Sequence, residues 1–98
     1  MTMVTVINPF EVPQEREEEA LSVWDTFAEY FRRQPGYIST RLHKALTPDA
    51  KFHLINIAEW ESAEAFQAAL SNPDLQDIAK ELPNDIQHYP GLYEVVRT

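Results

Sequence analysis

The alternation of apolar and polar positions predicts four strands, at residues 3–12, 37–46, 51–60 and 92–97. Side chains of an extended chain point to opposite faces in turn. The first strand therefore places Val4, Val6, Asn8 and Phe10 on one face. Both faces of the third strand are largely apolar, which is typical of a sheet that is covered on both sides.

Apolar residues that recur with a period close to 3.6 residues predict a helix over residues 14–33. Glutamates at its start and arginines at its end both suit the helix dipole. We expect the acidic run at residues 15–19 to be solvated. After the third strand, Ser62 is a predicted N-cap for a helix that ends at Leu70. Asn72, followed by proline, is predicted to begin another helix that runs to about Leu82.

The resulting order is strand, helix, strand, strand, helix pair, strand. Two split βαβ units of this kind fold as an α+β, ferredoxin-like βαββαβ sandwich. We expect a four-stranded antiparallel sheet with the helices on one face, in one domain spanning residues 1–98.

The opposite face of that sheet would expose Ile7, Ile55 and Ile57 in a monomer. An apolar patch of this kind usually marks an interface. The sequence therefore predicts a symmetric homodimer that packs sheet to sheet, the dimeric α/β-barrel type of assembly.

Charge and composition narrow the classes of partner and the kinds of site that the chain can have. Sixteen acidic and eight basic side chains give a formal net charge of −8, which argues against nucleic acid and anionic membranes as partners. No stretch is apolar enough to span a bilayer, and residues 1–10 do not have the pattern of a signal peptide. The chain has no cysteine, which excludes disulfides, thiolate catalysis and cysteine-ligated metals. The cytoplasm is the expected location.

Asn8, Asn56 and Trp60 are the unusual residues of the predicted helix-facing side of the sheet. Asparagine is disfavoured in strands, and a buried amide without a partner costs a few kcal/mol. Each amide could satisfy backbone groups or the other amide, or could present a hydrogen bond to a ligand. Trp60 could be a core side chain or a wall for a flat aromatic ligand.

The three histidines do not have the spacing of metal ligands with nearby carboxylates, so no metal site is expected. Alternation places His43 and His53 on the predicted dimer face, and His88 lies in a polar segment. We expect all three to be solvated or at an interface. The sequence also lacks a phosphate loop, a dinucleotide fingerprint and a nucleophile elbow. Any activity must then come from a pocket that binds and polarises its ligand.

Four segments taken together resemble the antibiotic biosynthesis monooxygenase (ABM) family: residues 6–10 (VINPF), 33–37 (RQPGY), 55–60 (INIAEW) and 65–66 (AF). The likeness spans nearly the whole chain in order. It is strongest to cofactor-independent anthrone oxygenases of aromatic polyketide pathways. In those enzymes two asparagines and a tryptophan line the pocket, and they fall on Asn8, Asn56 and Trp60.

The resemblance implies an oxidation of an electron-rich, polycyclic phenol by O2 to a quinone, without flavin, haem or metal. The substrate loses a proton, its carbanion passes an electron to O2, and the resulting peroxide loses water. The two asparagines would hydrogen-bond the substrate or peroxide, and Trp60 would orient the ring. Five aromatic side chains would line and partly fill the substrate pocket: Phe10, Trp24, Phe27, Phe31 and Phe66.

The chain also departs from its relatives. Phe66 stands where one relative has a proton-transferring tyrosine. The haem-degrading branch needs an asparagine, which Asn8 could match, and also a tryptophan and an iron-binding histidine, which fall near Ala69 and Ala79 here. Haem degradation is therefore not expected. Two alternatives stay open: a non-catalytic small-ligand-binding or stress-response module, and a cyclase-like activity on a polyketide.

Overall fold

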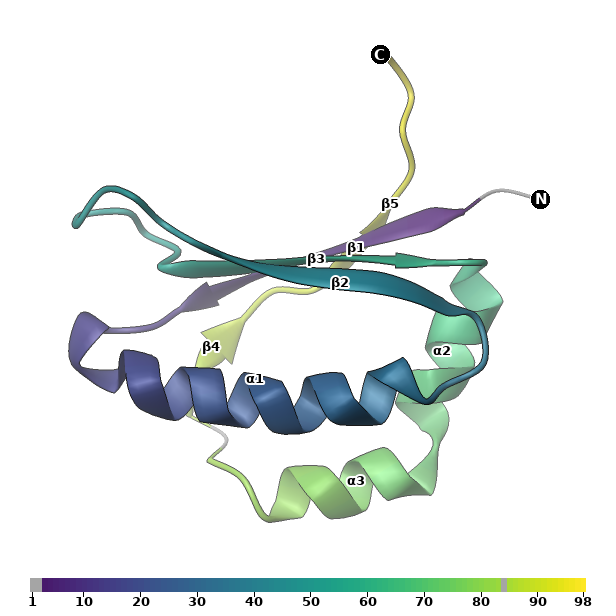
Figure 1. Cartoon of the computed structure of the whole chain (residues 1–98), viewed down its shortest axis with the longest axis horizontal. Coiled ribbons are helices and arrows are strands. Elements are labelled where there is room, and N and C mark those ends of the chain that lie inside the picture. Colours follow the sequence, from purple (N-terminus) through teal and green to yellow (C-terminus); the bar gives the residue numbers. More distant parts are fainter. Residues whose placement is uncertain (1–2, 84) are drawn as a thin grey trace.

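The structure is a computed structural model that describes residues 3–83 and 85–98. Residues 1, 2 and 84 of the predicted domain lie outside this described part. One layer is an antiparallel sheet and the other consists of helices on a single face of it (Figure 1). The strands are β1 (Val4–Glu11), β2 (Tyr37–Lys44), β3 (Leu54–Trp60), β4 (Gln87–His88) and β5 (Gly91–Tyr93). Their order is β2-β3-β1, and both short strands pair with the free edge of β1. The predicted ferredoxin-like α+β fold is confirmed.

Helices α1 (Glu17–Arg32), α2 (Ala63–Ser71) and α3 (Pro73–Lys80) form the second layer. Both predicted caps are present. The Ser62 hydroxyl accepts a hydrogen bond from Ala65 N at 3.1 Å, and the Asn72 side chain accepts one from Asp74 N at 2.9 Å. Within the described residues, no helix has the length and apolar character needed to cross a bilayer.

The start of the helix predicted over residues 14–33 differs from the prediction. Its first turn is a 3₁₀ helix, η1 (Gln14–Arg16), and α1 starts only at Glu17. The break lies at Arg16, whose φ of −107° and ψ of 12° are outside the α-helical region.

The register of β1 against β3 fixes the floor of the site. Asn8 lies directly opposite Asn56, two residues from the Val6–Ala58 pair. Opposite residues of an antiparallel pair project to the same face. Because Val6 and Ala58 are buried in one cluster with Ala69 of α2, this face is the one that the helices cover.

The last strand was predicted at residues 92–97, and this placement is wrong. Pro90 has no backbone N–H to donate, and it separates β4 from β5. Tyr93 pairs with Thr5, and β1 begins at Val4, so the chain beyond residue 94 runs past the end of its partner strand. Residues 94–98 instead form an exposed tail that leaves the sheet on the side away from the helices (Figure 1).

The third strand was predicted from residue 51 but starts at Leu54, and the prediction for His53 is wrong. His53 is buried, with 6 % of its surface exposed. Its Nε2 atom lies 2.6 Å from Oε1 of Glu17, and Lys44 Nζ lies 3.0 Å from the same oxygen. Glu17 is therefore paired, and the expectation that the whole acidic run at residues 15–19 is solvated is wrong for this residue. Its pKa is lowered, first by the hydrogen bond with His53 and then by Lys44.

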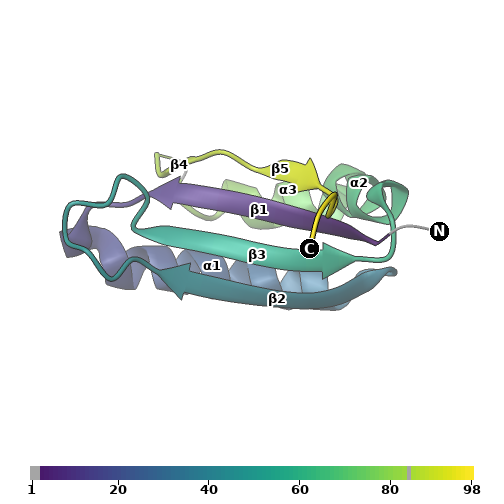
Figure 2. The same cartoon turned by 90° about the horizontal axis from the view of Figure 1, so that it is seen from above.

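The open face of the sheet is seen directly in Figure 2, with the tail toward the viewer. Ile57 is 37 % exposed there and Ile7 and Ile55 are half-buried. His43 pairs with Ile55 and is exposed, as predicted.

Candidate active site

A cavity of about 440 Å³ lies between the sheet and the helices. Small-molecule sites usually occupy roughly 300–1,000 Å³ and are mostly apolar, with a few placed polar groups. The cavity fits that description, since most of its lining side chains are aliphatic or aromatic. All eight residues that the sequence indicated line it: Asn8, Phe10, Trp24, Phe27, Phe31, Asn56, Trp60 and Phe66.

Asn8 and Asn56 form a cross-strand pair in the sheet floor of the cavity. Asn8 Oδ1 is buried and has no hydrogen-bond partner among the described residues. Leaving such an acceptor unpaired costs roughly 1–3 kcal/mol. The atom is therefore an acceptor that a ligand hydroxyl could satisfy.

Asn56 is held by its neighbour on β2. Thr40 Oγ1 donates a hydrogen bond of 2.7 Å to Asn56 Oδ1. Because the carbonyl oxygen is occupied in this way, the Asn56 amide group presents its N–H donors to other partners. The pair of asparagines thus places an unsatisfied buried acceptor, Asn8 Oδ1, beside the N–H donors of Asn56.

Trp60 lines the cavity and is the largest fully buried side chain of the described residues, at 1 % exposure. Its ring makes edge contacts with Phe31, Tyr37 and Phe66, at centroid distances of 6.0, 5.8 and 5.4 Å. Edge-to-face geometry at these distances is favourable. Trp60 is therefore both a core residue and part of the cavity wall.

The five predicted substrate-contacting aromatics come from three elements. Trp24, Phe27 and Phe31 lie along α1, Phe66 lies on α2, and Phe10 lies on β1. They leave space between them, although their bulk alone could have filled the interior. The helices that carry them are joined by Tyr30, whose hydroxyl donates a 2.6 Å hydrogen bond to the Ala69 carbonyl of α2.

Four polar or aromatic lining residues were not identified from the sequence: Tyr37, Thr40, Gln76 and His88. The period-2 pattern of the second strand could have identified Thr40, since alternation puts it on the same face as Leu42, and Leu42 pairs with Asn56. His88 was expected to be solvated or at an interface. It is exposed but also lines the cavity, and so lies at its mouth.

His88 stacks on the ring of Phe10, with centroids 5.6 Å apart and an interplanar angle of 14°. Partial removal from water disfavours the charged imidazolium. This desolvation lowers the pKa of His88 below its ordinary value of 6.5. The surroundings of His88 therefore favour the neutral imidazole over the charged form.

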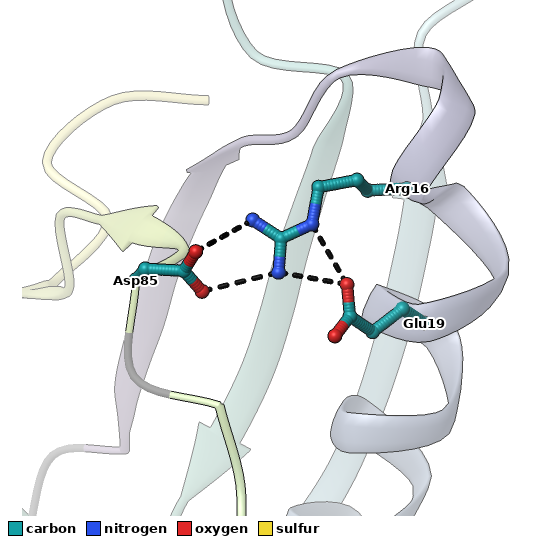
Figure 3. Close-up of polar contacts among 3 residues, drawn as sticks. All are labelled: Arg16, Glu19 and Asp85. Carbon is teal, nitrogen blue, oxygen red and sulfur yellow. Dashed lines mark hydrogen bonds and ion pairs between the residues drawn. The ribbon is translucent and has the colours of Figure 1, made fainter.

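An ion-pair group ties the segment before β4 to the start of α1 (Figure 3). Arg16 Nη1 and Nη2 donate to the two carboxylate oxygens of Asp85 at 3.0 and 3.1 Å. Its Nε donates to Glu19 Oε1 at 2.7 Å. The guanidinium lowers the pKa of Asp85 and the two carboxylates raise the pKa of Arg16. The fork-to-fork geometry orients the chain that leads into β4.

Comparison with known proteins agrees with this architecture. The sequence profile of the family "Antibiotic biosynthesis monooxygenase" matches residues 3–81. Deoxynogalonate monooxygenase of Streptomyces nogalater is 37 % identical over 73 residues, which are 71 % of this chain and 57 % of that protein. The chain therefore spans little more than half the length of this curated relative.

Several solved structures cover nearly the whole chain, and two of the proteins are described as oxygenases or monooxygenases at 30 % identity or more. A candidate monooxygenase from Shewanella loihica has a TM-score of 0.83 and 37 % identity, over 99 % of this chain and 97 % of the other. SnoaB, a cofactor-independent oxygenase from Streptomyces nogalater, has a TM-score of 0.75 and 30 % identity, over 100 % and 97 % of the two chains. Given the profile match, the fold and these relatives, the chain belongs to the antibiotic biosynthesis monooxygenase family.

Proposed function

We propose that this protein is a cofactor-independent monooxygenase that oxidises a polycyclic phenol of the anthrone class to a quinone with O2. The observation that carries the proposal is the asparagine pair in the floor of an apolar cavity, with an unsatisfied acceptor on Asn8 and N–H donors on Asn56. Ligand hydrogen bonds would relieve the unpaired Asn8 oxygen.

The relatives support the same chemistry. SnoaB is described as a cofactor-independent oxygenase, and the curated relative is a monooxygenase that acts on deoxynogalonate. The family membership of the chain makes an oxygenase the first hypothesis, and the cavity supplies the features such an enzyme needs: an apolar interior and oriented polar groups.

The proposed reaction converts a ring CH2 and O2 into C=O and H2O. Proton loss from the CH2 leaves an electron pair that is delocalised onto the ring carbonyl oxygen. The Asn56 N–H would stabilise this oxyanion. The Asn8 oxygen would accept a hydrogen bond from a phenolic O–H beside that carbonyl. The Trp60 edge and the α1 aromatics would hold the flat ring. O2 then takes one electron, the radicals combine to a peroxide, and loss of water leaves the quinone.

Oxygen uptake with dithranol, a 1,8-dihydroxyanthrone, tests the proposal in chelator-treated protein with no added cofactor. We expect O2 consumption and quinone formation well above the spontaneous rate. Asn56→Ala with Trp60→Ala should abolish the enzymatic part, while Tyr30→Phe, which removes a buried hydrogen bond outside the cavity, should retain it. Binding without O2 uptake would instead identify a non-catalytic ligand-binding module. A product formed without O2 would identify a cyclase.

We also propose that two copies pack through the open sheet face. That face carries Ile7, Ile55 and Ile57, and the opposite charges of Arg41 and Glu59 lie on it as well. A two-fold related copy can pair each Arg41 with a Glu59 while it buries the isoleucines. Sedimentation velocity at micromolar concentration should show a dimer, and Ile57→Glu should dissociate it. A monomeric wild-type protein would exclude this assembly.

A further inference from the structure

The lining of the cavity contains few groups that can exchange a proton. Among its described residues there is no aspartate, glutamate, lysine or arginine, and only Tyr37 and His88 carry titratable side chains. The proposed reaction nevertheless begins with removal of a proton from carbon. Some group must accept that proton in a site whose other side chains are amides, hydroxyls and hydrocarbons.

We propose that His88 is the general base that accepts this proton, an assignment that rests on the proposed function. His88 lies opposite Phe10 in the β1–β4 pairing. Phe10 and Asn8 are two residues apart on β1 and therefore project to the same face. The imidazole thus lies on the cavity side of the sheet, one step along the strand from the asparagine pair.

The surroundings of the imidazole suit the role. Neutral imidazole is the form that can take up a proton, and desolvation at the Phe10 stack favours that form. The charged groups on the adjoining elements are already paired. Glu11 of β1 accepts a 2.6 Å hydrogen bond from the Tyr89 hydroxyl, and Asp85 is held by Arg16.

These same contacts fix the position of His88. Tyr89 N donates to the Pro9 carbonyl at 3.0 Å directly after His88, and the Arg16–Asp85 pair holds the chain three residues before it (Figure 3). β4 is only two residues long, so its few backbone hydrogen bonds with β1 would not by themselves fix the orientation of His88. The flanking contacts supply that orientation. Arg16 and Asp85 are positioning residues for the imidazole.

In the proposed step a C–H bond of the substrate breaks and an N–H bond forms on the imidazole. The electron pair of the C–H bond stays on the substrate as the oxyanion held by Asn56. Because His88 is exposed at the cavity mouth, its proton can leave to bulk water before the next turnover. O2 remains the oxidant and is not needed for this first step.

The absence of O2 therefore isolates the step experimentally. Anaerobic stopped-flow mixing with dithranol would follow the substrate anion by its visible absorbance, and quenching of tryptophan fluorescence would follow binding. In wild-type protein, the rate of anion formation should rise with pH to a plateau, and the midpoint of the rise should lie below 6.5, the ordinary histidine value. His88→Gln should bind dithranol but form the anion about 10²-fold or more slowly. Added imidazole should restore part of the rate to His88→Ala.

His43→Gln is the matched control, because it removes an imidazole from the open sheet face and should leave the rate unchanged. A wild-type anion rate in His88→Gln, or a wild-type rate that does not depend on pH between 5 and 8, would overturn the assignment, as would the absence of any anion. Anion formation without later O2 uptake would refute the proposed function while supporting His88. O2 uptake at the wild-type rate in His88→Gln would refute the role of His88 while supporting the proposed function.

Discussion

Thr40 holds the Asn56 amide in the orientation on which the proposed site depends, and its removal is the most informative single change. Thr40→Val replaces the hydroxyl by a methyl group of similar size, so packing is nearly conserved. The variant loses the 2.7 Å hydrogen bond to Asn56 Oδ1 and leaves that oxygen without its donor. The amide is then free to rotate.

The expected cost follows from the character of this hydrogen bond. A net hydrogen bond contributes about 1 kcal/mol, and an acceptor left unpaired in the interior costs roughly 1–3 kcal/mol. Asn56 is half-buried beside a cavity, which allows some rehydration. We therefore expect a loss of about 1–2 kcal/mol. For a chain of 98 residues, each kcal/mol lowers the melting temperature by about 4–8 °C.

Urea denaturation and O2 uptake with dithranol, measured on the same preparations, separate stability from activity. Tyr30→Phe loses a buried 2.6 Å hydrogen bond elsewhere and should lose similar stability but keep its turnover per folded molecule. Thr40→Val should lose turnover as well, and Thr40→Ser should keep both. In the Thr40→Val, Asn56→Ala double variant the two effects should not add. Equal turnover in Thr40→Val and Tyr30→Phe, or strict additivity, would refute the reasoning.

Two further predictions concern the frame around the site. Gly36 has a φ of +89°, and a Cβ there would lie 2.5 Å from the Ala65 Cβ. Gly36→Ala should therefore lower the free energy of unfolding, measured by urea denaturation, by about 1–3 kcal/mol or more. An unchanged urea midpoint would contradict this. The Asp85 pKa is depressed below its ordinary 3.8 by Arg16, so its stabilising contribution is present above that pH and is lost as the pH falls through the lower, folded-state value. The stability difference between wild type and Asp85→Asn should accordingly vanish toward pH 2, and a difference that persists there would exclude the ion pair as its cause.

Much of the fold and of the site was accessible from the sequence because it depends on local periodicity. Alternation alone put Asn8 and Asn56 on one face, and the helical period put Trp24, Phe27 and Phe31 on one stripe. The facing of Asn8 and Asn56 across β1 and β3 could not be read in the same way, because register is set by pairing between distant segments.

The errors have physical causes of the same kind. His53 leaves the strand pattern because it is paired with Glu17, 36 residues away, and no local rule anticipates that contact. The last strand was predicted too far along the chain, because the start of its partner strand β1 limits how far β5 can extend. His88 was overlooked because Pro90 breaks the strand, so alternation from the C-terminal segment did not extend to it.

The central claim is that the cavity is an oxygen-using site, and O2 uptake tests it most directly. Chelator-treated wild-type protein with dithranol and no cofactor should consume one O2 for each quinone formed, faster than dithranol alone, and Asn8→Ala with Asn56→Ala should fall to the spontaneous rate while still folded. An uptake rate equal to that of dithranol alone, in protein whose tryptophan fluorescence shows that the anthrone is bound, would contradict the claim.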